Sequence, residues 1–105
     1  MEYEIEPSDV KVQLAGGDVV LIDVREGWER EVAAIQPSRH IPMGDVPARL
    51  QDLNPDDHII VYCHHGVRSM NVTAWLRQQG FEKAQSMAGG IDAWSRVVDP
   101  KVPVY

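Results

Sequence analysis

Cysteine is almost absent from this chain, because Cys63 is the only one among 105 residues. A single cysteine forms no disulfide within the chain, which excludes a small secreted domain stapled by disulfides. It also excludes an oxidoreductase mechanism that needs a second, resolving cysteine in the same chain. Chemistry at Cys63 must therefore proceed without another thiol from this chain.

Positive charge is also scarce, with 10 lysine and arginine residues against 16 acidic residues and a formal net charge of −6. No basic stripe exists to neutralise phosphates, which argues against a nucleic-acid partner and an anionic membrane surface. No apolar run approaches the length needed to span a bilayer. The acidic segment Met1–Glu6 contains no hydrophobic signal. We therefore expect a cytoplasmic protein with no nucleic-acid and no membrane partner.

The order of the expected elements indicates one α/β domain over residues 1–105. Apolar runs of strand type alternate with helical patterns, which predicts a parallel sheet of about five strands with helices on both faces. Strands are expected at 19–22, around Ile41, at 59–62 and at 84–87, and helices at 8–16, 26–34, 46–53, 69–79 and 91–97. Residues 98–105 are expected to form an extended C-terminal tail.

Side-chain roles within these elements also follow from local patterns. Ser8 is predicted to cap the first helix, because serine is a favoured N-cap residue. Trp28, Val32 and Ile35 are spaced i, i+4 and i+7, which predicts an inward helix face. Gly80 is placed to end the longest helix in a left-handed conformation, with Phe81 packing back onto that helix.

The segment around Cys63 carries the strongest chemical signal. The strand at 59–62 ends at this cysteine, Gly66 and Arg68 follow, and a helical pattern begins at Ser69. Ligands of open α/β sheets bind beyond the carboxyl ends of the strands. The amino end of a helix adds free backbone N–H groups and the positive end of the helix dipole. These conditions favour a thiolate and hold an anion beside it, so we interpret Cys63 as a nucleophile.

The stretch Cys63-His64-His65-Gly66-Val67-Arg68 resembles the active-site loop of the rhodanese sulfurtransferases. Further similarity to that family, in the same order along the chain, is found in Leu21–Glu26 with Trp28-Glu29, His40-Ile41-Pro42, Gly80-Phe81 and Gly89–Trp94. The resemblance covers the chain from about Pro7 to Trp94.

This resemblance implies a rhodanese-like α/β fold and an enzyme of the thiosulfate sulfurtransferase type. Such a transferase moves sulfane sulfur from thiosulfate or a persulfide donor to cyanide, a small thiol or a protein thiol. Cys63 would be the catalytic residue and carry the sulfur as a persulfide. The substrate-binding residues would be His64, His65, Gly66, Val67 and Arg68, with Arg68 attracting the anionic donor. No cofactor is expected, because the cysteine sulfur carries the transferred atom.

Two alternatives without any catalytic role, and a metal site, compete with this interpretation. Cys63 could be an inert core thiol, although such a thiol needs no glycine-containing loop and arginine after it. The loop could be an ordinary strand–helix connection. A metal site at Cys63, His64 and His65 is disfavoured, because adjacent residues rarely converge on one ion and zinc sites use spaced pairs. We expect no metal.

Two other function classes also remain open. A cysteine phosphatase presents C-x₅-R around a tetrahedral phosphate, whereas Arg68 gives the shorter C-x₄-R, which resembles the sulfur-handling loop. A non-catalytic, partner-binding module on the rhodanese fold is the other alternative, disfavoured by the intact cysteine and loop. Asp23 and Arg25 are assigned a structural role, and Gly89-Gly90 is expected to let the backbone pass close to the loop.

Overall fold

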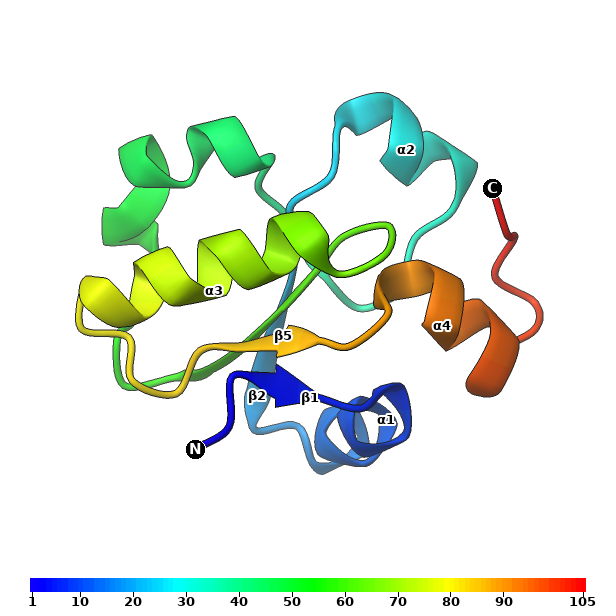
Figure 1. Ribbon diagram of the computed structural model, residues 1–105, viewed down its shortest axis with the longest axis horizontal. Helices are drawn as coiled ribbons and strands as arrows, with labels where there is room; N and C mark the ends of the chain where they lie inside the picture. The colour runs from blue at the N-terminus through cyan, green and yellow to red at the C-terminus, as the bar shows by residue number, and fades with distance from the viewer.

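A computed structural model describes all 105 residues and contains one parallel sheet with the strand order β1-β5-β4-β2-β3 (Figure 1). All the strand pairings are parallel. This arrangement confirms the predicted five-stranded α/β fold, with β4 at the centre of the sheet. The strands are Glu4–Ile5 (β1), Val19–Asp23 (β2), Arg39–His40 (β3), His58–Tyr62 (β4) and Gln85–Met87 (β5).

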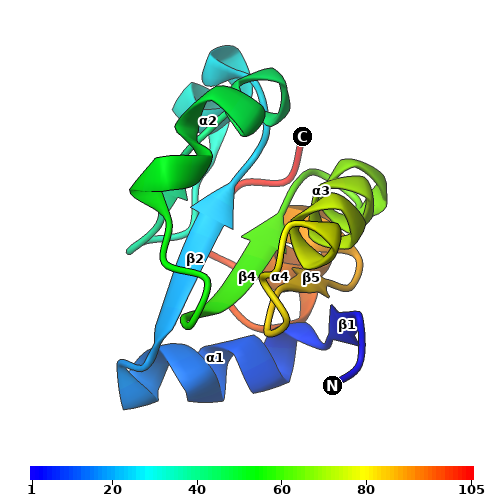
Figure 2. The same cartoon turned by 90° about the vertical axis from the view of Figure 1, so that its left-hand side faces the viewer.

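Helices cover both faces of the sheet, as the ribbon shows from two directions (Figures 1 and 2). No helix is both long and apolar enough to cross a membrane. The segment predicted as a helix at 46–53 is a 3₁₀ helix, kinked at Arg49. The helices are Pro7–Gly16 (α1), Gly27–Val32 (α2), Val67–Gln78 (α3) and Gly90–Val97 (α4), with 3₁₀ helices Met43–Asp45 (η1) and Pro47–Asp52 (η2).

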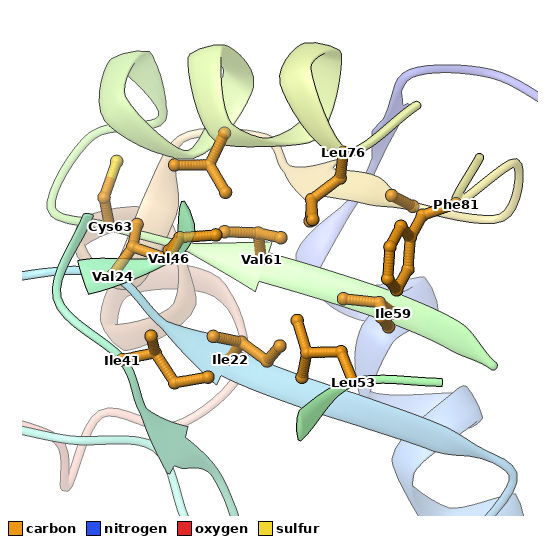
Figure 3. Close-up of a cluster of buried hydrophobic side chains, with 12 residues drawn as sticks. Ile22, Val24, Ile41, Val46, Leu53, Ile59, Val61, Cys63, Leu76 and Phe81 are labelled. Atoms are coloured by element: carbon orange, nitrogen blue, oxygen red, sulfur yellow. The ribbon is translucent and has the colours of Figure 1, made fainter. Parts of the chain in front are cut away.

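The central strand β4 divides the apolar core into two clusters. Successive side chains of a strand point to opposite faces, so Ile59 and Val61 enter one cluster and Ile60 and Tyr62 the other. Cys63 lies in the cluster between the sheet and α3, at the end nearest the first turn of that helix (Figure 3). The strand thus carries the thiol to the carboxyl edge of the sheet, under the amino end of a helix.

The helix α3 and its end agree with the predicted pattern. It begins at Val67, two residues before the predicted start at Ser69. Gly80 has φ +95°, and the Phe81 N–H donates to the Leu76 carbonyl at 3.0 Å. Phe81 is buried in the same cluster as Leu76, which confirms the predicted helix end.

Two predictions at the amino terminus were wrong or incomplete. The first helix begins at Pro7 with Glu6 as its N-cap residue, so Ser8 is inside the helix. Proline suits the first helical position, because its φ is preset and its missing N–H would have no helical partner. The short strand β1 was not predicted; it pairs Glu4 with Ser86 and Ile5 with Met87.

The predicted inward face of the second helix was also wrong. The helix α2 ends at Val32, and Trp28 and Val32 are 62% and 45% exposed, while Ile35 is buried beyond the helix end. The residue of α2 that faces inward is Glu29, with an exposed fraction of 3%. A carboxylate is buried in this way only when it is paired and hydrogen-bonded, and its partners belong to the candidate site.

Candidate active site

The Cys63 sulfur lies in a cradle of backbone amides. Cys63 is 1% exposed, and its Sγ accepts hydrogen bonds from the Gly66 amide at 3.1 Å and the Ser69 amide at 3.3 Å. The Ser69 amide belongs to the first turn of α3, where backbone N–H groups have no partner within the helix. Two dipoles therefore point at the sulfur from the loop and the helix start, an arrangement that stabilises negative charge on it.

The start of α4 holds the same loop from its other side. The Ile91 amide donates to the Cys63 carbonyl at 2.9 Å, and the Asp92 amide donates to the His64 carbonyl at 3.1 Å. The C=O and N–H of a trans peptide point in opposite directions. Because these two carbonyls face α4, the amides of His64 and His65 face away from α4.

Gly90 makes this close approach of α4 to the loop sterically feasible. Its φ is +61°, and a Cβ atom there would lie 2.5 Å from the Cys63 carbonyl oxygen. Any other residue would meet both backbone strain and a steric overlap. The prediction that the glycine pair lets the backbone pass close to the loop is confirmed at this position.

Two buried hydroxyl groups lie beside the sulfur. The Cys63 Sγ is 3.4 Å from the Ser69 Oγ, which is 2.7 Å from the Ser86 Oγ of β5 and 3.2 Å from the Gly66 carbonyl oxygen. Both serines are fully buried. The Ser69 hydroxyl therefore connects the sulfur, the loop and the neighbouring strand. Sequence patterns assigned no role to either serine side chain.

Arg68, at the end of the loop, forms a bidentate ion pair with Glu29 of α2. The two nitrogen–oxygen distances are 2.7 and 2.9 Å. These hydrogen bonds, donated by Arg68 and accepted by Glu29, lower the pKa of Glu29 to about 2 and raise the pKa of Arg68. The side chain of Arg68 is 31% exposed, but Glu29 compensates its charge within the protein. The sequence motif contained Glu29 without indicating this partnership.

Tyr105, at the end of the tail, contacts both ends of the loop region. Its hydroxyl donates to Glu29 Oε2 at 2.7 Å and accepts from Arg25 Nη1 at 2.8 Å. Its ring stacks on the His64 ring, with centroids 3.8 Å apart and an interplanar angle of 3°. Burial and the hydrogen bond to Glu29 raise the pKa of Tyr105 to about 12. Sequence reasoning missed this residue.

Asp23 and Arg25 form a fully buried ion pair beneath α2. Arg25 Nε and Nη2 donate to the two Asp23 carboxylate oxygens at 2.9 and 2.7 Å. Burial opposes ionisation of Asp23, but the hydrogen bonds from Arg25 prevail and hold its pKa below the usual value. Arg25 also donates to the backbone carbonyls of Glu29 and Ala33. These contacts support the structural role expected for both residues.

The remaining loop side chains form the rim of the site. Val67 and His65 are exposed, and the His65 ring stacks on that of His64 at a centroid distance of 3.8 Å. The possible ligand atoms of His64, His65 and Asp92 lie within 4.8 Å of one another. The two rings are stacked with an interplanar angle of 29°, and Asp92 binds Arg96 at 3.1 Å. His64 Nε2 also lies 2.8 Å from the Tyr105 backbone oxygen, so His64 and Asp92 both have partners within the chain.

Comparison with known proteins identifies relatives over most of the chain. The model of the rhodanese-like domain family matches residues 6–97. The chain is 34% identical over 97 residues to a protein of Allochromatium vinosum named sulfurtransferase, covering 91% of each. It is 32% identical over 93 residues to the thiosulfate sulfurtransferase GlpE of Glaesserella parasuis, covering 89% of this chain and 86% of that one.

Solved structures show the same likeness in three dimensions. A rhodanese-related protein from Thermoplasma volcanium superposes with a TM-score of 0.86 at 27% identity. The match covers 99% of this chain and 100% of the other. A rhodanese-like domain protein from Staphylococcus aureus superposes with a TM-score of 0.84 at 28% identity, covering 99% of both chains.

Proposed function

We propose that this chain, which belongs to the rhodanese-like domain family and is a sulfurtransferase, carries the transferred sulfur on Cys63 as a persulfide. The observation that carries this proposal is the pair of backbone amides, from Gly66 and Ser69, that donate to the Cys63 sulfur. A thiol that served only to fill the core would need no such donors.

The proposed reaction has two steps at the Cys63 sulfur. In the first, the thiolate attacks the outer sulfur of thiosulfate, a new S–S bond forms, and sulfite leaves with the electron pair of the broken S–S bond. In the second, a nucleophilic acceptor attacks the terminal sulfur of the persulfide. The bond between Sγ and that sulfur breaks, and its electron pair returns to Sγ as the thiolate. This is covalent catalysis with ping-pong kinetics.

The cradle would lower the barrier of both steps by stabilising negative charge. The Gly66 and Ser69 amides contact Sγ, which is the nucleophile in the first step and the leaving group in the second. Such preorganised donors are typically worth about 3–4 kcal/mol each in transition-state stabilisation. The amides of His64 and His65, turned away from α4, would add donors for the terminal sulfur and the donor's oxygens.

The substrates we propose are a small anionic donor such as thiosulfate and an acceptor that is cyanide, a small thiol or a protein thiol. The residues His64–Arg68 would surround the donor. Because Glu29 compensates the charge of Arg68, we assign recognition of the anion chiefly to backbone N–H groups. Arg68 would hold the end of the loop in place.

Intact-mass spectrometry combined with turnover tests this function. Protein incubated with thiosulfate should gain one sulfur atom and lose it when cyanide is added, with thiocyanate as the product. Cys63→Ser should form neither the adduct nor thiocyanate, while Ser8→Ala, on the exposed surface of α1, should behave as wild type. Thiocyanate formation by Cys63→Ser at the wild-type rate would rule out the persulfide on this residue.

A further inference from the structure

Tyr105 lies outside the part of the chain that matches the family, yet it contacts the active-site loop. The family match ends at residue 97, and the chain then turns back so that its end lies beside α2 (Figures 1 and 2). The family match therefore offers no account of this residue. Its contacts must be explained from the structure alone.

The first set of contacts fixes the residue that follows the nucleophile. The Tyr105 ring lies 3.8 Å from the His64 ring and almost parallel to it. The Tyr105 backbone oxygen is 2.8 Å from His64 Nε2. A backbone oxygen only accepts, so Nε2 donates this bond. Tyr105 thus holds the His64 ring through its face and through one nitrogen, which limits rotation of a side chain next to Cys63.

The second set of contacts fixes the other end of the loop through Glu29. The Tyr105 hydroxyl donates to Glu29 Oε2, and the two oxygens of Glu29 receive the guanidinium of Arg68. The same hydroxyl accepts from the buried Arg25. One phenol group therefore uses both its donor and an acceptor lone pair to hold the carboxylate on which Arg68 depends.

The tail itself is anchored, so Tyr105 has a fixed position from which to act. The amides of Val98 and Asp99 donate to the Trp94 carbonyl at 2.8 and 3.0 Å, and the Val102 amide donates to the Asp99 carbonyl at 3.1 Å. Val98, Val102 and Tyr105 pack against the core cluster between the sheet and α4. Burial of these apolar groups offsets the entropy lost on ordering the tail.

We propose that Tyr105 is a positioning residue for sulfur transfer, which holds the loop from His64 to Arg68 so that its amides converge on the Cys63 sulfur. This proposal rests on the proposed function of Cys63. Tyr105 touches neither the sulfur nor, in the two steps above, the donor, and it acts through His64 and Glu29. A displacement of about 1 Å in such a site can lower turnover by as much as about 100-fold.

Two substitutions at Tyr105 separate its two sets of contacts. Tyr105→Phe keeps the ring on His64 and removes the hydroxyl, whereas Tyr105→Ala removes both. Tyr3 is the matched control, because its ring packs on Arg77 near the far end of α3, with the guanidinium 4.1 Å from the ring centroid. Tyr3→Phe and Tyr3→Ala thus make the same chemical changes away from the loop.

The expected readout is a fall in kcat with a smaller change in KM. For thiosulfate and cyanide, we expect Tyr105→Ala to lower kcat at least about 10-fold and Tyr105→Phe about 3-fold. The Tyr3 variants should stay within about 2-fold of wild type. Kinetics are measured where urea unfolding shows each variant to be folded. If folded Tyr105→Phe and Tyr105→Ala both keep the wild-type kcat, the proposal is wrong.

Hydrogen exchange separates this proposal from the proposed function. The Gly66 and Ser69 amides, protected by their bonds to Sγ, should exchange faster in Tyr105→Phe and Tyr105→Ala and at the wild-type rate in the Tyr3 variants. If wild type transfers no sulfur, the proposed function fails, but this exchange pattern would still support the positioning of the loop. Unchanged exchange at both amides in the Tyr105 variants would overturn the positioning role, even in an active enzyme.

Discussion

Arg68 and Glu29 join the end of the loop that follows Cys63 to α2 by two parallel hydrogen bonds of 2.7 and 2.9 Å. Because Glu29 is buried and Arg68 is partly exposed, the pair is only partly screened by water. It therefore has two consequences that differ from those of a free surface arginine. It stabilises the fold, and it removes most of the charge that Arg68 would otherwise present to an anion.

The contribution of the Arg68–Glu29 pair to the free energy of unfolding should appear in a double-mutant cycle. Arg68→Ala leaves the buried Glu29 carboxylate without its main partner, and we expect it to lower the free energy of unfolding by about 2–3 kcal/mol. Arg68→Ala combined with Glu29→Gln should cost about 1–2 kcal/mol less than the sum of the two single substitutions. Urea unfolding measures all four proteins. Strict additivity would show that the two side chains do not stabilise each other.

The compensation of the Arg68 charge by Glu29 should appear in the relative kcat/KM values for two donors of different charge. An alkanethiosulfonate offers the same outer sulfur as thiosulfate with one negative charge instead of two. We expect Arg68→Ala combined with Glu29→Gln to reduce kcat/KM for both donors by similar factors, because the loop is displaced while the net charge of the pair stays at zero. A loss for thiosulfate more than about 10-fold larger than for the thiosulfonate, equal to about 1.4 kcal/mol, would show that Arg68 recognises donor charge.

Stability at low pH should depend on Glu29. Its pKa falls from the ordinary 4.5 to about 2 in the folded protein. A depressed folded-state pKa contributes stability that is fully present above the unfolded value and is lost as the pH falls toward the folded value. The destabilisation caused by Glu29→Gln should thus be largest near pH 6, on the order of 3 kcal/mol, and shrink between about pH 4.5 and 2.

Urea unfolding of wild type and Glu29→Gln at several pH values checks this dependence. Asp23, whose pKa is also lowered, is present in both proteins and contributes equally to their acid sensitivity. Glu31→Gln is the control, because Glu31 is an exposed acidic residue of the same helix. A difference between wild type and Glu29→Gln that does not shrink below pH 4.5 would contradict the assignment.

Gly90→Ala should damage the loop and the fold together. The new methyl group would overlap the Cys63 carbonyl, and the alanine backbone would have to adopt a positive φ. We expect these two effects to cost about 2–4 kcal/mol of unfolding free energy. The variant should also lose most of its sulfur transfer, because the loop carbonyls must move. Gly44→Ala is the control, since its added Cβ would meet no atom within 4 Å beyond its chain neighbours and the backbone of its own helix. Wild-type stability and turnover in Gly90→Ala would contradict this account of the loop.

Loop length provides a prediction about substrate class. The unmodified protein should hydrolyse no aryl phosphate, because loop amides that converge on one sulfur atom leave too little space for the oxygens of a phosphate group. One glycine inserted between Val67 and Arg68 creates C-x₅-R, and it should weaken sulfur transfer and permit some phosphate ester hydrolysis. Cys63→Ser in the inserted protein is the control for turnover by the thiol. Phosphatase activity of the wild type that Cys63→Ser abolishes would favour a cysteine phosphatase instead.

Local patterns predicted most of the fold, because the signals of strands and helices lie within short segments. The apolar run before Cys63 and the helical period after it are both complete within about 20 residues. Gly80 and Phe81 mark a helix end by their own conformational preferences. The position of the thiol followed from these elements, since a strand followed by a helix places the connecting loop at the edge of the sheet.

The contacts that sequence patterns did not reveal join residues far apart in the chain. Glu29 is 39 residues from Arg68 and 76 from Tyr105. In the helical pattern of α2, Trp28 had the stronger apolar signal, and only the distant partners explain why the carboxylate is buried instead. The strand β1 has two residues, too few to show a period, and its pairing with β5 spans most of the chain.

The attachment of the loop to α4 limits what could be transplanted from this protein. A graft of residues 58–78 into another scaffold would bring the cysteine, the loop and the whole of α3. It would omit the Ile91 and Asp92 amides that bind the Cys63 and His64 carbonyls. The smallest unit that keeps the Cys63 loop in this conformation is therefore discontinuous, and a recipient scaffold must supply a second helix start with glycine at the point of closest approach.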